Sequence, residues 1–232
     1  MDNYVVCLKH GNKYSSDYVN TLYNMVQRNL SIEHKFVCFT ESSHGLNKNI
    51  EVVDLPEIKV AGWWYKPMFF NPKLPVKGKL LYFDLDVVIF NNIDKLFTYE
   101  PDKFCIIRDF NRHVRPDWDK MNSSCFRLDT GTQPQVYNNF RKNTKEVTAK
   151  FFGDQDWIYN QVKDNFAFWP DEWLQSYKWE MRGKPPMTRI NGVRNFVTPG
   201  EPTILPETSV AVFHGEPNPP QCQDQWVIDN WR

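Results

Sequence analysis

The sequence has no long apolar segment and no excess of charge of either sign. Nowhere in its 232 residues does a stretch approach the roughly 20 apolar residues of a membrane-spanning helix, so we expect no transmembrane segment. The 28 Lys and Arg residues balance the 28 Asp and Glu residues. No block of like charge runs along the chain that could follow a phosphate backbone. We therefore expect no nucleic-acid partner.

Features of secretion and of disulfide or metal chemistry are also scarce. The first ten residues carry a short apolar run without a basic start or a small-residue cleavage site, so no signal peptide is predicted. The cysteines are odd in number, no CxxC pair occurs, and most lie in or beside apolar runs typical of strands. We expect a cytoplasmic protein whose cysteines are reduced structural thiols: Cys7, Cys38, Cys105, Cys125 and Cys222.

What the sequence does have is a large share of aromatic side chains. Aromatic residues make up 16%, hydrophobic residues 41% and charged residues 24% of the chain. This composition excludes disorder and indicates a compact globule. The length fits one domain, and no repeat, low-complexity tract or Gly/Ser linker divides it. We therefore expect a single domain over residues 1–232.

Short β-branched runs alternate with helical patterns along the chain, which predicts an α/β sheet. Strands are predicted at residues 4–9, 34–40, 50–55, 80–83, 87–90, 104–108, 125–128 and 210–214. Helices are predicted to start at Ser15 or Ser16, at 135–147 and after Gly153, with an aromatic helix or turn at 62–70. From Trp169 onward Pro and Trp are frequent, so we expect long ordered loops over one sheet face.

Two carboxylates, Asp84 and Asp86, follow directly on an apolar strand. Ligands of open α/β sheets bind at the carboxyl ends of strands. Residues at i and i+2 of a strand point to the same side, so their oxygens can share one cation. The alternative is a strand-terminating Asx turn. Two further Asp-x-Asp pairs occur: Asp117 and Asp119 in a charged loop, and Asp154 and Asp156 at a helix start.

Three other residues could contact a ligand. His214 ends a short strand beside Gly215, a residue that allows close approach of the backbone to a metal or phosphate, although it could equally be a partly exposed imidazole. Lys66 lies in an aromatic segment and could hold a phosphate, and Tyr14 follows the first strand. Taken singly, a solvated Lys and a packed Tyr account for the last two.

Four motifs in this order resemble the metal-dependent glycosyltransferases of the GT-A fold, in particular glycosyltransferase family 8, which includes glycogenin and bacterial lipopolysaccharide galactosyltransferases. The motifs span nearly the whole chain. They are the first strand with its Tyr14 loop, LLYFDLD at 80–86, GDQDWI at 153–158 and VAVFHG at 210–215. The resemblance implies a mixed central sheet flanked by helices, a nucleotide-binding half over 1–130 and an acceptor-side half over 131–232.

The resemblance also implies a metal and its ligands. Asp84, Asp86 and His214 would coordinate Mn²⁺, with Mg²⁺ as the alternative, and the metal would bridge the two phosphates of a UDP-sugar. A dication there neutralises the charge of the diphosphate leaving group as it develops. Two carboxylates and one imidazole suit Mn²⁺ better than Mg²⁺.

Further roles follow from the same resemblance. Tyr14 would stack on uracil, Lys66 would approach the diphosphate or the sugar, Gly215 would lie at the nucleotide, and Asp84 would also reach the ribose. The reaction would move a hexose from the UDP donor to a carbohydrate-type acceptor held by residues 164–204. Anomeric configuration would be retained, through Asp154 as nucleophile or through a same-face displacement assisted by the leaving phosphate. Sugar hydroxyls would be held by Asn122, Ser123, Asp154 and Gln155, the last two also being the catalytic candidates.

One position departs from the family pattern. Where the histidine motif of the family usually continues to a Lys that contacts the diphosphate, this chain has the neutral Asn218. The phosphate site therefore loses a point charge. Another cation, such as Lys66 or Arg108, would have to compensate, or activity would be weak, or the donor would be held differently.

Two other functions fit part of the pattern. In haloacid-dehalogenase-like phosphatases, Asp84 would be the nucleophile and Asp86 the acid; that family normally opens with this strand, whereas here three strands precede it. A non-catalytic protein that binds nucleotide sugars is the second alternative. Asn218 and the many aromatic residues of the C-terminal third are compatible with it.

Overall fold

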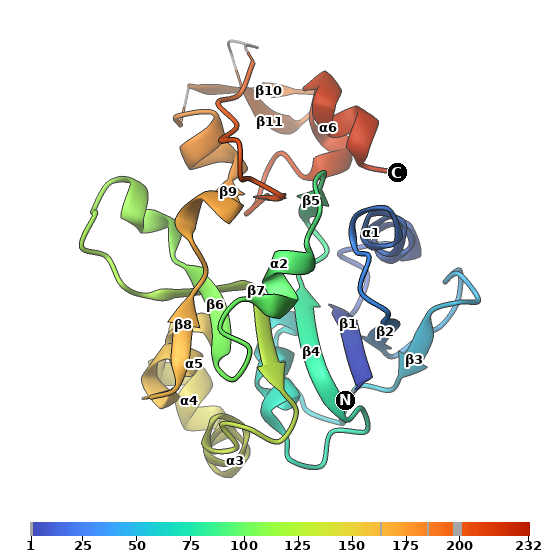
Figure 1. Ribbon diagram of the computed structural model, residues 1–232, viewed down its shortest axis with the longest axis vertical. Coiled ribbons are helices and arrows are strands. Elements are labelled where there is room, and N and C mark those ends of the chain that lie inside the picture. Colours follow the sequence, from blue (N-terminus) through green and yellow to red (C-terminus); the bar gives the residue numbers. More distant parts are fainter. Residues whose placement is uncertain (1, 163, 185, 197–200) are drawn as a thin grey trace.

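A central mixed sheet of seven strands forms the body of the protein. The structure, a computed structural model, describes residues 2–162, 164–184, 186–196 and 201–232. Parallel pairing joins β1 to β2 and β4, β2 to β3, and β6 to β8, whereas β7 runs antiparallel to β4 and β6 (Figure 1). In spatial order the strands are β3 (Glu51–Val53), β2 (Lys35–Thr40), β1 (Asp2–Lys9), β4 (Gly78–Phe83), β7 (Met121–Asp129), β6 (Phe104–Arg108) and β8 (Phe166–Phe168).

Both faces of this sheet are buried, because its strands alternate apolar side chains between two cores. Leu81 and Phe83 of β4 belong to one core, and Leu80 and Tyr82 to the other. Helix α1 (Ser16–Asn29) covers the first face, and the side chain of Ser15 caps it as predicted. The second face is covered by η1 (Gly62–Phe70), α3 (Gln135–Lys142), α4 (Thr144–Lys150) and α5 (Asp154–Gln161).

A small three-stranded sheet lies beyond the carboxyl end of β4. It consists of β5 (Val87–Ile89), β12 (Val210–Val212) and β9 (Leu174–Ser176), with β12 in the middle. In Figure 1 it lies above the central sheet. The three residues Asp84, Leu85 and Asp86 connect β4 to β5, so the two sequence-predicted carboxylates lie at the junction of the two sheets.

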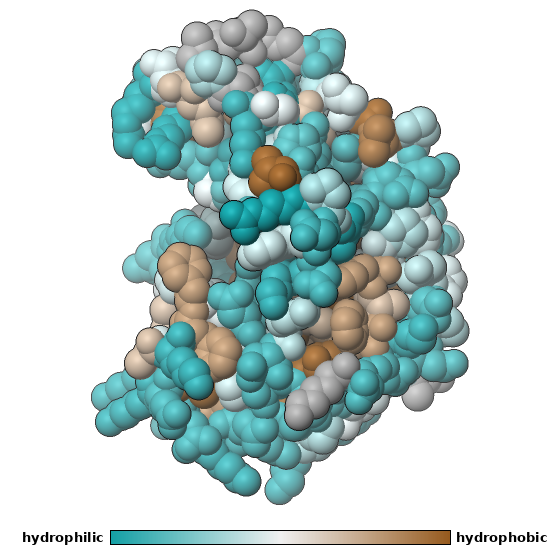
Figure 2. Space-filling model, turned by 90° about the vertical axis from the view of Figure 1, so that its left-hand side faces the viewer, coloured by the Kyte–Doolittle hydropathy of each residue, from teal (hydrophilic) through white to brown (hydrophobic). Residues whose placement is uncertain are grey.

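The C-terminal third contains more regular structure than predicted. The expected long loops are replaced by short elements, several of which gather near the top of Figure 1, and the outline of the molecule is hollowed below this upper part in Figure 2. Elements of three to six residues are too short to show a periodicity in the sequence. They include η3 (Asp171–Trp173), the π-helix η4 (Tyr177–Met181), the hairpin of β10 (Met187–Ile190) and β11 (Val193–Phe196), η5 (Pro219–Gln221) and α6 (Gln225–Asn230).

Several element boundaries differ from the prediction. The helix predicted over 135–147 is two helices, because Asn143 leaves the helical region with φ of −132°. Strand β7 starts at Met121, so Asn122 and Ser123 lie within it. The short helices α2 (Asp94–Thr98) and η2 (Phe110–His113) were not predicted.

The predictions about cysteines and membrane helices hold over the described residues. All five cysteines are buried free thiols. No helix in the described part of the chain combines the length and the apolar character needed to cross a bilayer.

Candidate active site

The predicted carboxylates lie where the two sheets meet and are fixed there by backbone hydrogen bonds. The amide of Asp84 donates to the carbonyl of Ser124 on β7 (2.8 Å). The carbonyl of Asp86 accepts from the amide of Phe213, just after β12 (2.9 Å). The ends of β4 and β12 and the middle of β7 are thereby joined at one point, although they are far apart in the sequence.

A buried lysine neutralises Asp84. Lys66 Nζ lies 2.8 Å from Asp84 Oδ1 and donates to Oδ2 (3.0 Å), and the Tyr82 hydroxyl donates to Oδ1 (2.7 Å). Lys66 is only 6% exposed. Burial alone lowers the pKa of Lys66, but the charges of Asp154 and Asp84 outweigh that effect and the pKa is raised. The ammonium and the Asp84 carboxylate therefore form a charge-balanced pair.

The four predicted sugar-binding residues come together beside this pair. Lys66 Nζ donates to the carbonyl and the hydroxyl of Ser123 (both 3.1 Å) and lies 3.7 Å from Asp154 Oδ2. The Ser123 hydroxyl donates to that same Oδ2 (2.6 Å). Next to it, Asn122 donates to Gln155 Oε1 (3.4 Å). Burial raises the pKa of Asp154 despite the opposing charge of Lys66.

Asp86 has very different surroundings. Its Oδ2 accepts a hydrogen bond from the Tyr14 hydroxyl (3.1 Å), and no ion pair to Asp86 is formed by any residue that the structure describes. Burial and the neighbouring charge of Asp84 raise the pKa of Asp86 to about 7. Burial and Asp86 in turn raise the pKa of Tyr14. Asp86 is thus a carboxylate whose charge is not compensated.

A cavity of about 310 Å³ opens onto both carboxylates. Asp84, Asp86, Lys66 and Tyr14 all contribute to its wall, so four of the residues predicted to bind the nucleotide or metal share one cavity. The remaining wall is formed mainly by the loop after β1 and the start of η1, including His10, Asn12, Lys13 and Trp63.

His214 is brought to the same junction, but its side chain is engaged elsewhere. Its Nε2 is 2.6 Å from the Ser176 hydroxyl, and its ring stacks on Phe110 with centroids 5.6 Å apart. Burial and the charge of Lys178 lower the pKa of His214 to about 4, so the imidazole is neutral. Over the described residues, no three His, Cys, Asp or Glu side chains form a group placed to hold a metal ion.

The residues present nevertheless fit a cation in part. Asp84 and Asp86 are hard-oxygen donors two residues apart on the wall of one cavity, and no ion pair to Asp86 is formed within the described part of the chain. His214 is neutral, as a metal ligand must be, but its Nε2 would have to leave Ser176 to join the carboxylates.

Lys178, which also lies at this junction, was not predicted as a site residue. Lys178 Nζ donates to the carbonyls of His214 and of Glu216, the latter at 3.2 Å. Burial lowers the pKa of Lys178 to about 8, and the charge of Asp86 partly opposes that effect. It was missed because it lies in a π-helix of five residues without a recognisable motif.

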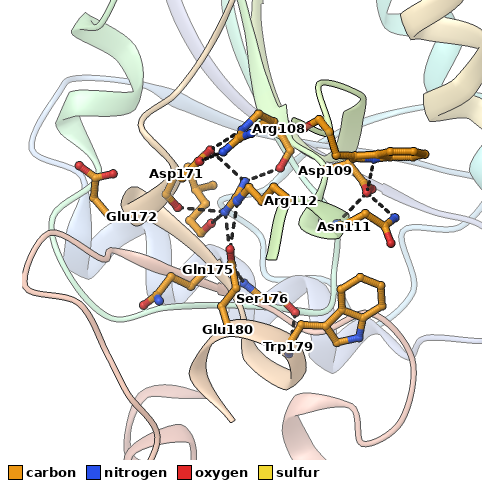
Figure 3. Close-up of polar contacts among 12 residues, drawn as sticks. Arg108, Asp109, Asn111, Arg112, Asp171, Glu172, Gln175, Ser176, Trp179 and Glu180 are labelled. Atoms are coloured by element: carbon orange, nitrogen blue, oxygen red, sulfur yellow. Dashed lines mark hydrogen bonds and ion pairs between the residues drawn. The ribbon is translucent and has the colours of Figure 1, made fainter. Parts of the chain in front are cut away.

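An ion-pair network holds the segment that carries Lys178 (Figure 3). Arg112 lies at its centre and donates to both oxygens of Glu180 (3.0 and 3.2 Å) and to the carbonyl of Leu174 (3.0 Å). Glu180 Oε2 accepts from the Ser176 amide (2.7 Å), which fixes the start of η4. Arg112 is 6% exposed, so these bonds form out of contact with water.

Neither cation suggested to compensate for Asn218 is free to do so. Lys66 is paired with Asp84 and Asp154. Arg108 forms a two-pronged ion pair with Asp171, also drawn in Figure 3, and donates to the carbonyl of Pro116 (2.9 Å). The other Asp-x-Asp pair, Asp117 and Asp119, lies in an exposed loop between η2 and β7, as predicted.

Comparison by sequence finds no matching family model and no matching curated protein. Comparison by structure does find similar proteins. The galactosyltransferase LgtC, solved with donor and acceptor sugar analogs, superposes with a TM-score of 0.62 at 13% identity, over 93% of this chain and 88% of LgtC. The glycosyltransferase GlyE of Streptococcus pneumoniae TIGR4 gives a TM-score of 0.67 at 12% identity, over 99% of this chain and 62% of GlyE.

The bifunctional glycosyltransferase WbbM gives a TM-score of 0.62 at 13% identity, over 99% of this chain and 49% of WbbM. The superpositions establish a common fold, and at such low sequence identity they establish nothing finer. That fold has a mixed central sheet flanked by helices, as predicted, and it does not favour the phosphatase alternative. The chain therefore has the GT-A fold of these glycosyltransferases.

Proposed function

We propose that this protein is a metal-dependent glycosyltransferase. It moves a hexose from a nucleotide-diphosphate sugar, in our proposal a UDP-hexose, to a glycan or other carbohydrate-type acceptor. The observation that carries the proposal is the cavity in which Asp86 lacks a compensating charge while Asp84, two residues earlier, has one. Asp86 therefore needs a positive partner, and a metal ion bound together with a diphosphate would supply it.

Mn²⁺ is our proposed cofactor, with Mg²⁺ as the alternative. Asp84 and Asp86 would hold it through carboxylate oxygens, with His214 as the third ligand after its imidazole leaves Ser176. When bound, the metal would stabilise the negative charge that develops on the departing diphosphate.

The residues around the cavity would bind and orient the donor. Tyr14 stacks on the uracil ring, and Gly215 allows the backbone to approach the diphosphate, since it is exposed and adopts a φ of +83° that favours glycine. Lys66 holds the Asp84 carboxylate in place, so that Asp84 can also accept a bond from the ribose. Residues 1–130 would form the nucleotide-binding half and residues 131–232 the acceptor side.

Sugar hydroxyls would be bound by Asn122, Ser123, Asp154 and Gln155. Asp154 is already bonded to Ser123 and lies near Lys66, which lowers its capacity to attack as a nucleophile. We therefore favour retention by same-face displacement, in which the leaving phosphate receives the acceptor's proton and Gln155 orients the sugar. Asp154 would then act by holding Lys66 and a hydroxyl.

The proposal is tested by measuring UDP released from UDP-glucose and UDP-galactose, with and without Mn²⁺, in the presence and absence of simple sugars as acceptors. We expect release that needs Mn²⁺ and is lost in Asp86→Asn. Binding of UDP with Mn²⁺ but no release from either donor would instead support the non-catalytic binding protein. Hydrolysis of p-nitrophenyl phosphate that Asp84→Asn abolishes would support the phosphatase.

A further inference from the structure

Lys178 is a buried cation with no acidic partner. It is 7% exposed, and within the described ranges no carboxylate lies within 4.0 Å of its Nζ, whereas both other buried cations of this region, Lys66 and Arg112, form ion pairs. Its hydrogen bonds go to backbone carbonyls of His214 and Glu216. Burial of an ammonium without a counter-charge costs free energy, and an anion bound beside Lys178 would offset that cost.

The position of Lys178 identifies the kind of anion. The carbonyls that it contacts flank Gly215, and a Cβ on that glycine would lie 3.4 Å from Nζ, so Nζ lies against this exposed turn. The turn follows Phe213, whose amide is bonded to Asp86. The backbone thus links Asp86 to the turn that Lys178 contacts. Within the described residues, neither Asp86 nor Lys178 forms an ion pair.

We propose that Lys178 contacts the diphosphate of the bound nucleotide and supplies the positive charge that Asn218 does not. This inference rests on the proposed function, because it assumes a nucleoside diphosphate at Asp84 and Asp86. A metal bound to a diphosphate brings a cation for Asp86 and an anion for Lys178, so one ligand would provide the missing partner of each. An ion pair between Asp86 and Lys178 would have met them without a ligand, but the two groups are not within ion-pair distance.

The surrounding structure holds Lys178 at the turn. It lies in the π-helix η4, and short π-helical segments occur often at functional sites. The Trp179 amide donates to the Ser176 hydroxyl (3.1 Å), and Glu180 ties the Ser176 amide to Arg112. The ammonium is therefore held in place before a ligand arrives, which reduces the entropy lost on binding.

Calorimetric titration with UDP and with uridine, both with Mn²⁺ present, tests the inference. We expect Lys178→Met to weaken UDP binding by about 10-fold or more and to change uridine binding by less than 2-fold, because uridine has no phosphate. Lys178→Arg should retain more UDP affinity than Lys178→Met. The control is Lys184→Met, which removes the same charge from an exposed position near the same turn and should leave both affinities unchanged.

Equal losses for UDP and uridine in Lys178→Met, or UDP affinity equal to that of the wild type, would overturn the inference. If Lys178→Met does not fold, a crystal structure of the wild type with UDP and Mn²⁺ decides: Nζ bonded to a phosphate oxygen supports it, and Nζ still bonded to carbonyls alone overturns it. Failure of the wild type to bind UDP would overturn both proposals. Normal UDP release and UDP binding by Lys178→Met would overturn this one alone.

Discussion

Asp84 and Asp86 lie two residues apart but in opposite electrostatic surroundings. Asp84 is bonded to Lys66 and Tyr82, and Lys66 extends the same network to Ser123 and Asp154. Among the described residues, only the Tyr14 hydroxyl donates a side-chain hydrogen bond to Asp86, and the pKa of Asp86 is raised to about 7. The Asp84 carboxylate therefore has a positive partner in the protein itself, whereas the Asp86 carboxylate would gain one only from a ligand.

This difference separates a structural role from a binding role. A pair such as Lys66 and Asp84 stabilises the fold of the empty protein, since the charges of Asp154 and Asp84 raise the pKa of the buried Lys66. An uncompensated carboxylate destabilises the empty protein and is tolerated where it gains a ligand. The same contrast holds on the other side of the junction, where Arg112 is paired with Glu180 but Lys178 has no acidic partner within the part of the chain that the structure describes.

The largest expected effect is that of Asp86→Asn on activity. Mn²⁺-dependent UDP release should fall by about 1000-fold, near 4 kcal/mol, because the variant loses a charged metal ligand. Its melting temperature at pH 8 should rise, because an ionised carboxylate that the fold disfavours is removed. Asp117→Asn, in an exposed loop, is the control and should change neither quantity. A variant that melts at a lower temperature would contradict the assignment of Asp86 as uncompensated.

Arg112→Met should have the largest effect on stability. It leaves Glu180 buried without its partner and frees the start of η4, which should lower the free energy of unfolding by about 3 kcal/mol. Denaturation by urea measures the change. Arg115→Met removes an exposed arginine nearby and should cost less than about 0.5 kcal/mol. Equal stabilities of the two variants would show that the network in Figure 3 contributes little.

Asp84→Asn should give the opposite stability change to Asp86→Asn. The variant leaves the buried Lys66 with the more distant Asp154, so the free energy of unfolding should fall by about 2 kcal/mol. UDP release should be lost in both variants. Thermal unfolding of the two proteins side by side provides the measurement, and shifts of the same sign would remove the contrast between the two carboxylates.

The smallest expected effect is that of Asn218→Lys. A point charge added beside the Gly215 turn should tighten binding of UDP, by about 5-fold, or 1 kcal/mol. Calorimetry with Mn²⁺ present measures this affinity. Asn218→Gln is the neutral control. Unchanged or weaker binding in Asn218→Lys would count against a diphosphate at this turn.

Most of the central sheet could be predicted from the sequence, because its strands carry apolar runs that end at charged or turn residues. β6 was predicted with its observed bounds, Phe104–Arg108, and the cap of α1, predicted as Ser15 or Ser16, is Ser15. In the small sheet, β5 and β12 were predicted as separate strands and β9 was not predicted, since strands of three residues contain little information about themselves or their partners. The pairing of β5 with β12 depends on contacts more than a hundred residues apart.

The candidate site divides in the same way. Asp84, Lys66, Ser123 and Asp154, each named from a motif, are in contact in the structure, whereas the roles of these residues remain proposals. The contact of His214 with Ser176 and the position of Lys178 were not foreseen. Both depend on how the π-helix η4 folds against β12, and its irregular geometry has no sequence signature.

The central claim is that the site lacks one metal and one diphosphate, which bind together. Thermal unfolding with Mn²⁺ alone, UDP alone and both tests it most directly, since a ligand that binds only the folded state stabilises it, and more so the tighter it binds. We predict that the shift with both ligands exceeds the sum of the separate shifts, and that Asp86→Asn abolishes the excess. Additive shifts in the wild type, or an excess that persists in Asp86→Asn, would contradict the account.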